Sequence, residues 1–413
     1  MPGFEESQRP RRQADDSGGW PAIEHETLPW ESKFATATSF GRYAGGPAEY
    51  QAAVPPLIAE RTPTIRPGVA ALARAAEQEL IRFDAALGDE MAGFAPLLLR
   101  SEAAASSQIE HLTASSRAIL TAEIAHEQGA TVSQRNANEI VGNTLAMRSA
   151  LALADQLTPD SVREMHRALM DGTNHTPGEW RTEPVWIGAS ARSPEHATFV
   201  APRYERVAEL IDDVMAFARR EDLPVLVQTA VAHAQFETIH PFTDGNGRTG
   251  RALVQAMLRN KEVTRSVVVP VSAGLLTDVA AYHAALTAYR TGDPNPIVEQ
   301  VSLAAGDAIA NARQLLEALT GTLAEWRRTV RPRAGSLPDR LLEYATRQPV
   351  FTAASAAKAL DVAVTNVYAP LKRLQELGIL KPKVEYRLGQ VWRTEQVLAE
   401  LDAFASRAGR RGR

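Results

Sequence analysis

His240-Pro-Phe-Thr-Asp-Gly-Asn-Gly-Arg-Thr-Gly-Arg251 is the stretch that decides how this sequence is interpreted. It follows an apolar-periodic helical segment, and Pro241 ends that helix so that His240 stands at its tip. Gly245 and Gly247 let the backbone bend and approach a ligand closely. The free amides at the start of the next helix then form an anion site. The stretch therefore predicts a helix–loop–helix that binds a phosphate group.

The charged side chains of this loop fit the same chemistry. Arg248 and Arg251 lie on one side of the first turn of the second helix, where guanidinium groups clamp phosphate oxygens. Asp244 is a suitable ligand for Mg²⁺, which takes one or two carboxylates together with phosphate oxygens. His240 is the only nearby group that accepts a proton at neutral pH. The loop therefore combines a base, an anion site, a metal ligand and two phosphate clamps. This combination indicates phosphate chemistry rather than an ordinary turn.

The loop resembles, at every signature position, the motif of the Fic family of protein adenylyltransferases. The resemblance implies transfer of AMP from ATP to a Ser, Thr or Tyr hydroxyl of a target protein, with His240 as general base and Asp244 as the Mg²⁺ ligand. In the related Doc kinases a Lys stands where Gly247 stands here, so its absence favours AMP transfer over phosphate transfer. The nucleotide would be held by Gly245, Asn246 and Gly247 on the α- and β-phosphates, Arg248 on the γ-phosphate, and Arg251 supporting the polyphosphate.

Two further segments resemble the same family. Residues 178–188 and 199–202 are similar to its flap, a β-hairpin that positions the target side chain by strand addition. The residues expected to dock the target on the flap edge are Trp186, Ile187 and Gly188. After the loop, residues 281–283 and 289–293 resemble the stretch that closes over the nucleotide, which implies a nucleotide-binding role for Tyr282. Taken outside that context, Trp186 and Tyr282 are equally typical of core aromatics.

Ser106 and Glu110 place a hydroxyl and a carboxylate on one face of a predicted helix. From spacing alone, the pair is typical of a solvated helix surface. Family members with an N-terminal inhibitory helix carry Ser/Thr-x-x-x-Glu followed by Gly or Asn, and His111 departs from that last position. The resemblance implies that Glu110 pairs with Arg248, withholds it from the γ-phosphate and so inhibits the enzyme. Whether Glu110 also helps to remove AMP stays open.

Composition limits the other classes of protein. The 413 residues are 45% hydrophobic and include no Cys, which allows a large core and excludes disulfides and thiolate catalysis. The sequence has neither a secretory-type leader nor an apolar run long enough to span a bilayer, so we expect a cytoplasmic protein without a membrane partner. Residues 337–413 carry 13 Lys and Arg against 8 Asp and Glu, whereas the net charge is −4. This asymmetry indicates two modules with different partners.

Periodicity predicts a mainly α protein with a small β-hairpin, followed by a C-terminal winged helix-turn-helix domain. The resemblance implies that the helical part is a Fic-type domain and that the hairpin is its flap. Five segments are expected: a flexible leader (1–48), an N-terminal helical region with the inhibitory motif (49–130), the Fic catalytic domain (131–330), a winged helix-like domain (338–400) and a basic tail (401–413).

Positive charge on the winged helix-like segment is compatible with DNA binding. Winged helices also mediate protein contacts, so a homodimer is the alternative. The residues concerned are Asn366, Lys372 and Arg373 on the second helix of the motif, Lys381, Lys383 and Arg387 on the wing, and Arg407, Arg410, Arg411 and Arg413 in the tail. For the whole chain, the rival of a Mg²⁺-dependent adenylyltransferase is a nucleotide-sensing transcriptional regulator. His240 and Asp244 favour the enzyme, because a sensor needs no general base.

Overall fold

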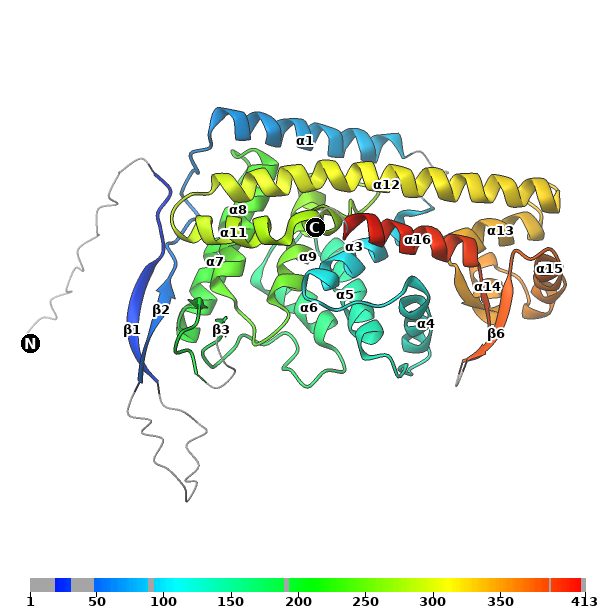
Figure 1. The fold of residues 1–413 in the computed structure, drawn as a ribbon, viewed down its shortest axis with the longest axis horizontal. Coiled ribbons are helices and arrows are strands. Elements are labelled where there is room, and N and C mark those ends of the chain that lie inside the picture. The colour runs from blue at the N-terminus through cyan, green and yellow to red at the C-terminus, as the bar shows by residue number, and fades with distance from the viewer. Residues whose placement is uncertain (1–18, 31–47, 88–92, 189–192, 386–387, 410–413) are drawn as a thin grey trace, which may run out of the picture.

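The structure is a computed structural model that describes residues 19–30, 48–87, 93–188, 193–385 and 388–409. Its body is helical, as predicted (Figure 1). The helices of the body are α1 (Pro67–Ala86), α3 (Ala95–Ile109), α4 (Ser116–Glu127), α5 (Arg135–Ala152), α6 (Pro159–Met170), α7 (Val207–Ala218), α8 (Val225–Ile239), α9 (Asn246–Asn260), α10 (Val271–Leu275), α11 (Val279–Arg290) and α12 (Asn295–Val330). Among the described residues, none of the helices is both long and apolar enough to cross a bilayer.

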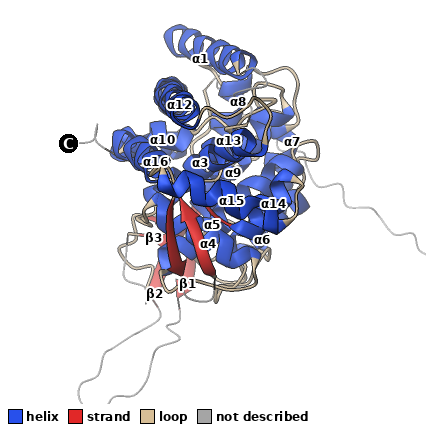
Figure 2. Cartoon of the chain, turned by 90° about the vertical axis from the view of Figure 1, so that its right-hand side faces the viewer, coloured by secondary structure: helices blue, strands red, loops and turns tan. Residues whose placement is uncertain are grey.

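Helix α8 lies at the centre of the body. Nearly all of its side chains are buried, because α1, α7, α9, α11 and α12 pack around it. Helices α1 and α12 lie side by side at one edge of the molecule in both views (Figures 1 and 2). The loop that follows α8 is therefore built on a helix that is enclosed on all sides.

Local signals in the sequence account for several helix ends. Thr158 and Ser161 form a capping box at the start of α6, with Pro159 in the first turn, as the sequence predicts. Helix α8 ends at His240, which adopts the left-handed conformation (φ 52°) directly before Pro241. Both ends are determined by neighbouring residues rather than by distant contacts.

The predicted flap hairpin is confirmed. Strand β3 (Trp186–Ile187) pairs antiparallel with β4 (Phe199–Val200), with Trp186 opposite Val200 and Ile187 opposite Phe199. Of the expected docking residues, Ile187 is 43% exposed and Trp186 is half-buried. Gly188 has φ +83°, and a Cβ there would lie 1.7 Å from Thr198 Oγ1, so this position requires glycine.

The N-terminal segment differs from the prediction. Strands β1 (Glu24–Trp30) and β2 (Ala48–Val54) pair antiparallel along their whole length, and Trp20 is buried beside Tyr289. The flexible leader predicted for 1–48 is therefore wrong for residues 19–30, and the helical pattern does not begin at Glu49. The strands are stabilised by each other and by the flap, since β2 packs on β4 and Trp30 contacts Trp186 at 5.4 Å between ring centroids. Residues 1–18 and 31–47 lie outside the described residues.

A smaller module follows α12. It contains α13 (Leu337–Arg347), β5 (Val350–Thr352), α14 (Ala353–Leu360), α15 (Val364–Glu376), β6 (Lys381–Glu385) and β7 (Gly389–Arg393), with strand order β5-β7-β6. This is the order of elements expected of a winged helix, although the assignment itself stays a prediction. The module lies at the end of the molecule that faces the viewer in Figure 2.

The last helix shows that the predicted boundary at residue 401 is misplaced. Helix α16 (Glu395–Ala408) runs through the segment predicted as a basic tail, and Leu401, Phe404 and Ala408 on it are buried. Arg407 donates to Asn311 Oδ1 on α12 (2.6 Å). The basic tail predicted for 401–413 is therefore part of a packed helix over residues 401–408, because apolar residues at helical spacing pack this segment on the body. Residues 410–413, and Arg387 of the predicted wing, lie outside the described residues.

Candidate active site

The loop 240–251 joins α8 to α9 and is held in a single shape by local contacts. Gly245 precedes α9 with φ +75°, and a Cβ there would lie 2.3 Å from Met170 Cε. The Asn246 side chain accepts from the Phe242 amide (2.8 Å) and donates to the Phe242 carbonyl (2.9 Å). Because its side chain is used to shape the loop, Asn246 offers a ligand its backbone amide. The start of α9 is thus a preformed anion site.

His240 stands beside this anion site as an uncharged imidazole. Its Nδ1 faces the Glu237 carbonyl oxygen at 3.4 Å, so Nδ1 carries the hydrogen and Nε2 is left as the proton acceptor. Burial lowers the pKa of His240 to about 4, and the positive charges of Arg181 and Arg290 act in the same direction. At pH 7 the ring is therefore neutral and able to take a proton.

Two residues that the sequence analysis did not assign hold the loop from below. Arg181 is buried and donates through Nε to the His240 carbonyl oxygen (2.8 Å), while its own amide donates to the carbonyl of Pro241 (2.9 Å). His166 on α6 stacks on Phe242 with 3.6 Å between ring centroids. Arg181 lies inside the quoted flap segment, but spacing alone does not reveal that its guanidinium reaches the catalytic loop.

The tautomer of His166 follows from its partners. Its Nδ1 accepts from the Gly178 amide (2.9 Å), so Nε2 carries the hydrogen and donates to the carbonyl oxygen of Asp244 (3.1 Å). Burial lowers the pKa of His166 to about 4, which keeps this neutral form at pH 7. His166 therefore ties the middle of the loop to α6 and to the start of the flap segment.

The Ser106–Glu110 motif meets the loop at Arg251. The Arg251 guanidinium donates through Nε to Ser106 Oγ (2.9 Å), and its Nη2 donates to the Ser106 carbonyl oxygen (2.8 Å) and to Glu110 Oε1 (2.9 Å). Burial opposes ionisation of Glu110, but its pair with Arg251 outweighs burial, and the pKa of Glu110 is lowered. Glu110 is thus a carboxylate anion at the loop.

Glu110 also lies against the anion site itself. A Cβ on Gly247 would lie 2.2 Å from Glu110 Oε1, so the carboxylate oxygen rests on the backbone of the first turn of α9. The glycine makes this close approach possible. The carboxylate therefore takes the place next to Gly247 where a phosphate oxygen is expected.

The predicted partner of Glu110 is wrong. Arg248 lies 3.8 Å from Glu139 Oε2 on α5 and 3.7 Å from Asp244 Oδ2, both through its terminal nitrogens. Residues three apart on a helix point about 60° away from each other. As a result Arg251 faces α3, which carries Glu110, whereas Arg248 faces α5. The two arginines do not form one clamp around the inhibitory carboxylate.

Asp244 lies at the inner end of a cleft of about 750 Å³ between α4, α5 and the end of α6. Its side chain is half exposed, Oδ1 accepts from the Gly245 amide (2.7 Å), and Oδ2 lies 3.4 Å from His175 Nε2. Within the described residues, no group of three or more His, Cys, Asp or Glu is arranged to hold a metal ion. Asp244 fits a Mg²⁺ that arrives with a nucleotide, because such an ion takes most of its ligands from phosphate and water.

Tyr282 belongs to a buried cluster on the far side of Arg251. Its hydroxyl is 2.7 Å from His233 Nε2, and its side chain is 1% exposed. Burial raises the pKa of the nearby Glu237 to about 7. The burial of Tyr282 matches the core alternative, and its contact with nucleotide stays a prediction.

Residues 156–258 match the family model described as Fic/DOC family. Within these residues the chain is similar to Fic domains. It is 31% identical to protein adenylyltransferase fic-1 of Caenorhabditis elegans over 41% of this chain and 32% of the relative. It is 30% identical to protein adenylyltransferase Fic of Drosophila erecta over 35% of this chain and 28% of the relative. The chain thus spans about a third of the length of these curated relatives.

The fold of the chain has a counterpart among solved structures. A crystal structure of a Fic family protein from Desulfovibrio desulfuricans G20 covers 80% of this chain and 97% of its own, with a TM-score of 0.51 at 24% identity. The segment matched to the Fic/DOC family runs from the start of α6 into α9 and so contains His240, Asp244 and both arginines. Glu110 and Tyr282 lie outside it, and the structure brings them to the loop.

Proposed function

We propose that this chain is a protein adenylyltransferase that moves AMP from ATP onto a hydroxyl side chain of a target protein. The observation that carries the proposal is the His240 imidazole, oriented by the Glu237 carbonyl, beside the anion site at the start of α9. The similarity to Fic domains and the names of the relatives, protein adenylyltransferase fic-1 and Fic, support it. A nucleotide-sensing regulator is less favoured, because nothing in that role needs a proton acceptor beside the anion site.

The chemistry assigned to the loop is an in-line transfer. The target hydroxyl oxygen attacks the α-phosphorus, its proton passes to His240 Nε2, and the bond from the α-phosphorus to the bridging oxygen breaks to release pyrophosphate. The amides of Gly245, Asn246 and Gly247 would stabilise charge on the phosphates. Mg²⁺, when bound with the nucleotide, neutralises phosphate charge, and Asp244 would be its protein ligand.

The proposed enzyme is self-inhibited through Arg251. A polyphosphate that needs this guanidinium must displace Glu110 from it, because both anions require the same Nη2 donor and the same space above Gly247. The role first expected for Arg248 as the blocked residue passes to Arg251, while Arg248 stays available beside Asp244. Whether Glu110 also directs water against an AMP adduct is tested by following release of labelled AMP from modified protein.

The target is expected to dock on the flap. Ile187 is exposed on the short strand β3, as strand addition by an extended target segment requires. This location would bring the hydroxyl of a bound Ser, Thr or Tyr to the loop at His240. Truncation of Ile187 should lower transfer to a target protein more than it lowers binding of ATP.

The test uses the full chain with Glu110 replaced by Gly, incubated with Mg²⁺ and either α-labelled or γ-labelled ATP. An adenylyltransferase leaves the α-label, but not the γ-label, covalently on protein. His240→Ala in the same background is the matched control and should abolish the α-label. Label from γ-labelled ATP would mean phosphate transfer, and ATP binding without any label would mean a sensor; either result overturns the proposal.

A further inference from the structure

The helix that carries Glu110 is packed between the catalytic loop and α16. One side of α3 meets α9 and α5, whereas another side meets α16, which in turn lies on α12. Figure 1 shows α16 running from the C-terminal module along α12 towards α3. Leu401 and Phe404 on α16 are buried in this contact. The C-terminal part of the chain therefore touches the helix that blocks the anion site.

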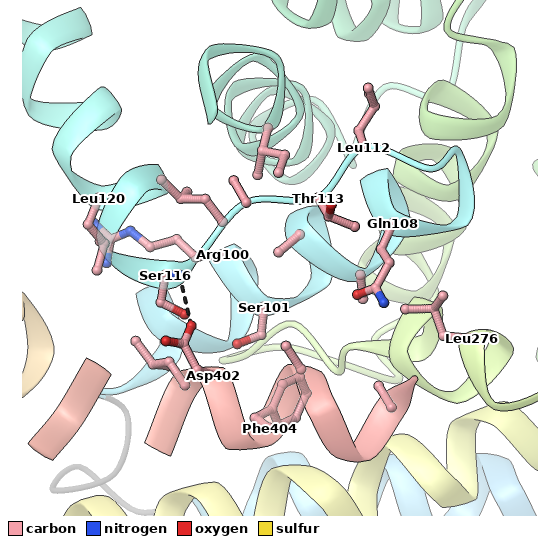
Figure 3. Close-up of a pocket in the computed structure, with 18 residues that line it drawn as sticks. Arg100, Ser101, Gln108, Leu112, Thr113, Ser116, Leu120, Leu276, Asp402 and Phe404 are labelled. Carbon is pink, nitrogen blue, oxygen red and sulfur yellow. Dashed lines mark hydrogen bonds between the residues drawn. The ribbon is translucent and has the colours of Figure 1, made fainter. Parts of the chain in front are cut away.

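Helix α16 also holds the start of α4. Asp402 Oδ1 accepts from the backbone amide of Ser116, the first residue of α4, at 2.9 Å (dashed in Figure 3). Amides in the first turn of a helix have no partner within the helix, and a carboxylate there is also favoured by the helix dipole. Arg117 and Glu395 add an ion pair at 2.6 Å. Ser115 Oγ caps α4 locally by accepting from the Ala118 amide, and Asp402 therefore adds a second cap from a different element.

This cap lies a short distance along the chain from Glu110. Helix α3 ends at Ile109, Glu110 follows, and a turn with His111 in the left-handed conformation leads to Ser116. The amide of Leu112 donates back to the Ser107 carbonyl (3.0 Å), so the turn is closed on the end of α3. Because the connection is short and hydrogen-bonded, the position of the α4 start constrains the position of Glu110.

A pocket of about 70 Å³ that opens to solvent, called the void below, lies between α3 and α16. It is lined by Gln108, Leu112 and Thr113 and, from α16, by Leu401, Phe404 and Ala405. Figure 3 shows Gln108, Thr113 and Phe404 around it. The void leaves space for the last turn of α3 to shift towards α16, away from Arg251.

We propose that α16 takes part in the self-inhibition by Glu110, because it holds Glu110 in its place on Arg251. Asp402 is a positioning residue: it fixes the start of α4, the connection to α3 and thereby the Glu110 carboxylate on Arg251. Loss of the cap allows the last turn of α3 to move into the void and exposes the guanidinium to nucleotide. This makes α16 a regulator of the loop, and the activity readout of the test rests on the proposed adenylyltransferase function.

The test compares three substitutions in the full chain. Asp402→Ala removes the cap, Asp402→Asn keeps an Oδ1 acceptor and is the matched control, and Ala405→Leu fills the void. Amide hydrogen exchange over residues 106–118 reports the motion without any need for activity. We expect Asp402→Ala to speed this exchange by roughly tenfold, as loss of one hydrogen bond to a charged group implies, Asp402→Asn to stay near wild type, and Ala405→Leu to slow it.

Transfer of α-label gives the second readout. Asp402→Ala should raise self-labelling several-fold, whereas Ala405→Leu should lower it. In the double variant with Glu110→Gly, Asp402→Ala should add nothing, since both changes free the same arginine. Wild-type exchange in Asp402→Ala, or a full additional increase on the Glu110→Gly background, would overturn the proposal. If Glu110→Gly itself transfers no label, the proposed function fails, and exchange alone decides whether α16 holds Glu110 in its place.

Discussion

Glu110 Oε1 lies 2.9 Å from Arg251 Nη2, and the two partners are unequally buried: the Arg251 side chain is 3% exposed and the Glu110 side chain 41%. The arginine is fixed in addition by two bonds to Ser106. The carboxylate therefore is the partner that moves, and the guanidinium remains in place for an incoming phosphate. An ion pair built in this way blocks the site without altering its shape.

Arg251 and Arg248 face different carboxylates, so substitution of Glu110 and of Glu139 should change self-labelling to different extents. Glu110→Gly breaks a charge-assisted hydrogen bond to Arg251, so we expect self-labelling to rise at least about tenfold. Glu139→Gln removes only the 3.8 Å contact to Arg248 and should change labelling less than about threefold. Initial rates with α-labelled ATP measure both. Stronger activation by Glu139→Gln would mean that Arg248 is the blocked residue after all.

Gly247 should be indispensable for nucleotide binding. A Cβ at this position enters the space that Glu110 Oε1 now takes, 2.2 Å away. In the Glu110→Gly background, Gly247→Ala should therefore weaken binding of a non-hydrolysable ATP analogue by tenfold or more, measured by titration calorimetry with Mg²⁺. The matched control is Gly306→Ala on α12, where a Cβ meets nothing within 4 Å. Equal affinities for the two variants would contradict an anion site at Gly247.

His240 should titrate far below an ordinary histidine. Burial disfavours its charged form, so the folded pKa is about 4, against about 6.5 in the unfolded chain. The stability that this group contributes is complete above pH 6.5 and is lost as the pH falls towards 4, because only the unfolded chain binds the proton in that range. NMR of ¹³C-labelled histidine, assigned with His240→Asn, gives the midpoint. A midpoint near 6.5 would show that the ring is solvated and not buried as the structure has it.

Arg181 should position His240 without binding nucleotide. Arg181→Ala leaves the carbonyl oxygens of His240, Glu183 and Pro202 without this donor, at a cost of about 1–3 kcal/mol in unfolding free energy. In the Glu110→Gly background we expect the transfer rate to fall at least tenfold while affinity for the ATP analogue changes less than about twofold. Chemical denaturation and single-turnover labelling separate the two effects. A matching loss of affinity would instead place Arg181 at the nucleotide.

The C-terminal module should bind DNA non-specifically if its charge serves that purpose. Lys372 and Arg373 on α15, and Lys381 and Lys383 on β6, are exposed. We expect retention on immobilised duplex DNA at low salt that falls as salt rises, and its loss on Lys372→Glu with Arg373→Glu. Retention that survives the double substitution, or none at low salt, would favour protein contacts or a homodimer through this module, which sedimentation would detect.

Local patterns in the sequence predict those features of the fold that depend on neighbouring residues. Pro241 ends α8, the Thr158 capping box begins α6, and the glycines of the loop allow the left-handed turn before α9. These features need only the backbone preferences of a few consecutive residues. The residues expected at the catalytic loop are for that reason together in the structure.

Which charged side chains form pairs depends on how the helices pack against each other. Glu110 pairs with Arg251 rather than Arg248 because the rotation of α9 against α3 and α5 assigns each arginine to a different neighbour. Packing likewise brings Arg181 to the His240 carbonyl. It also shows that the apolar face of α16 contacts α3 and α12. Such contacts join residues far apart in sequence, and their energies come from the packing of whole helices, which no local pattern records.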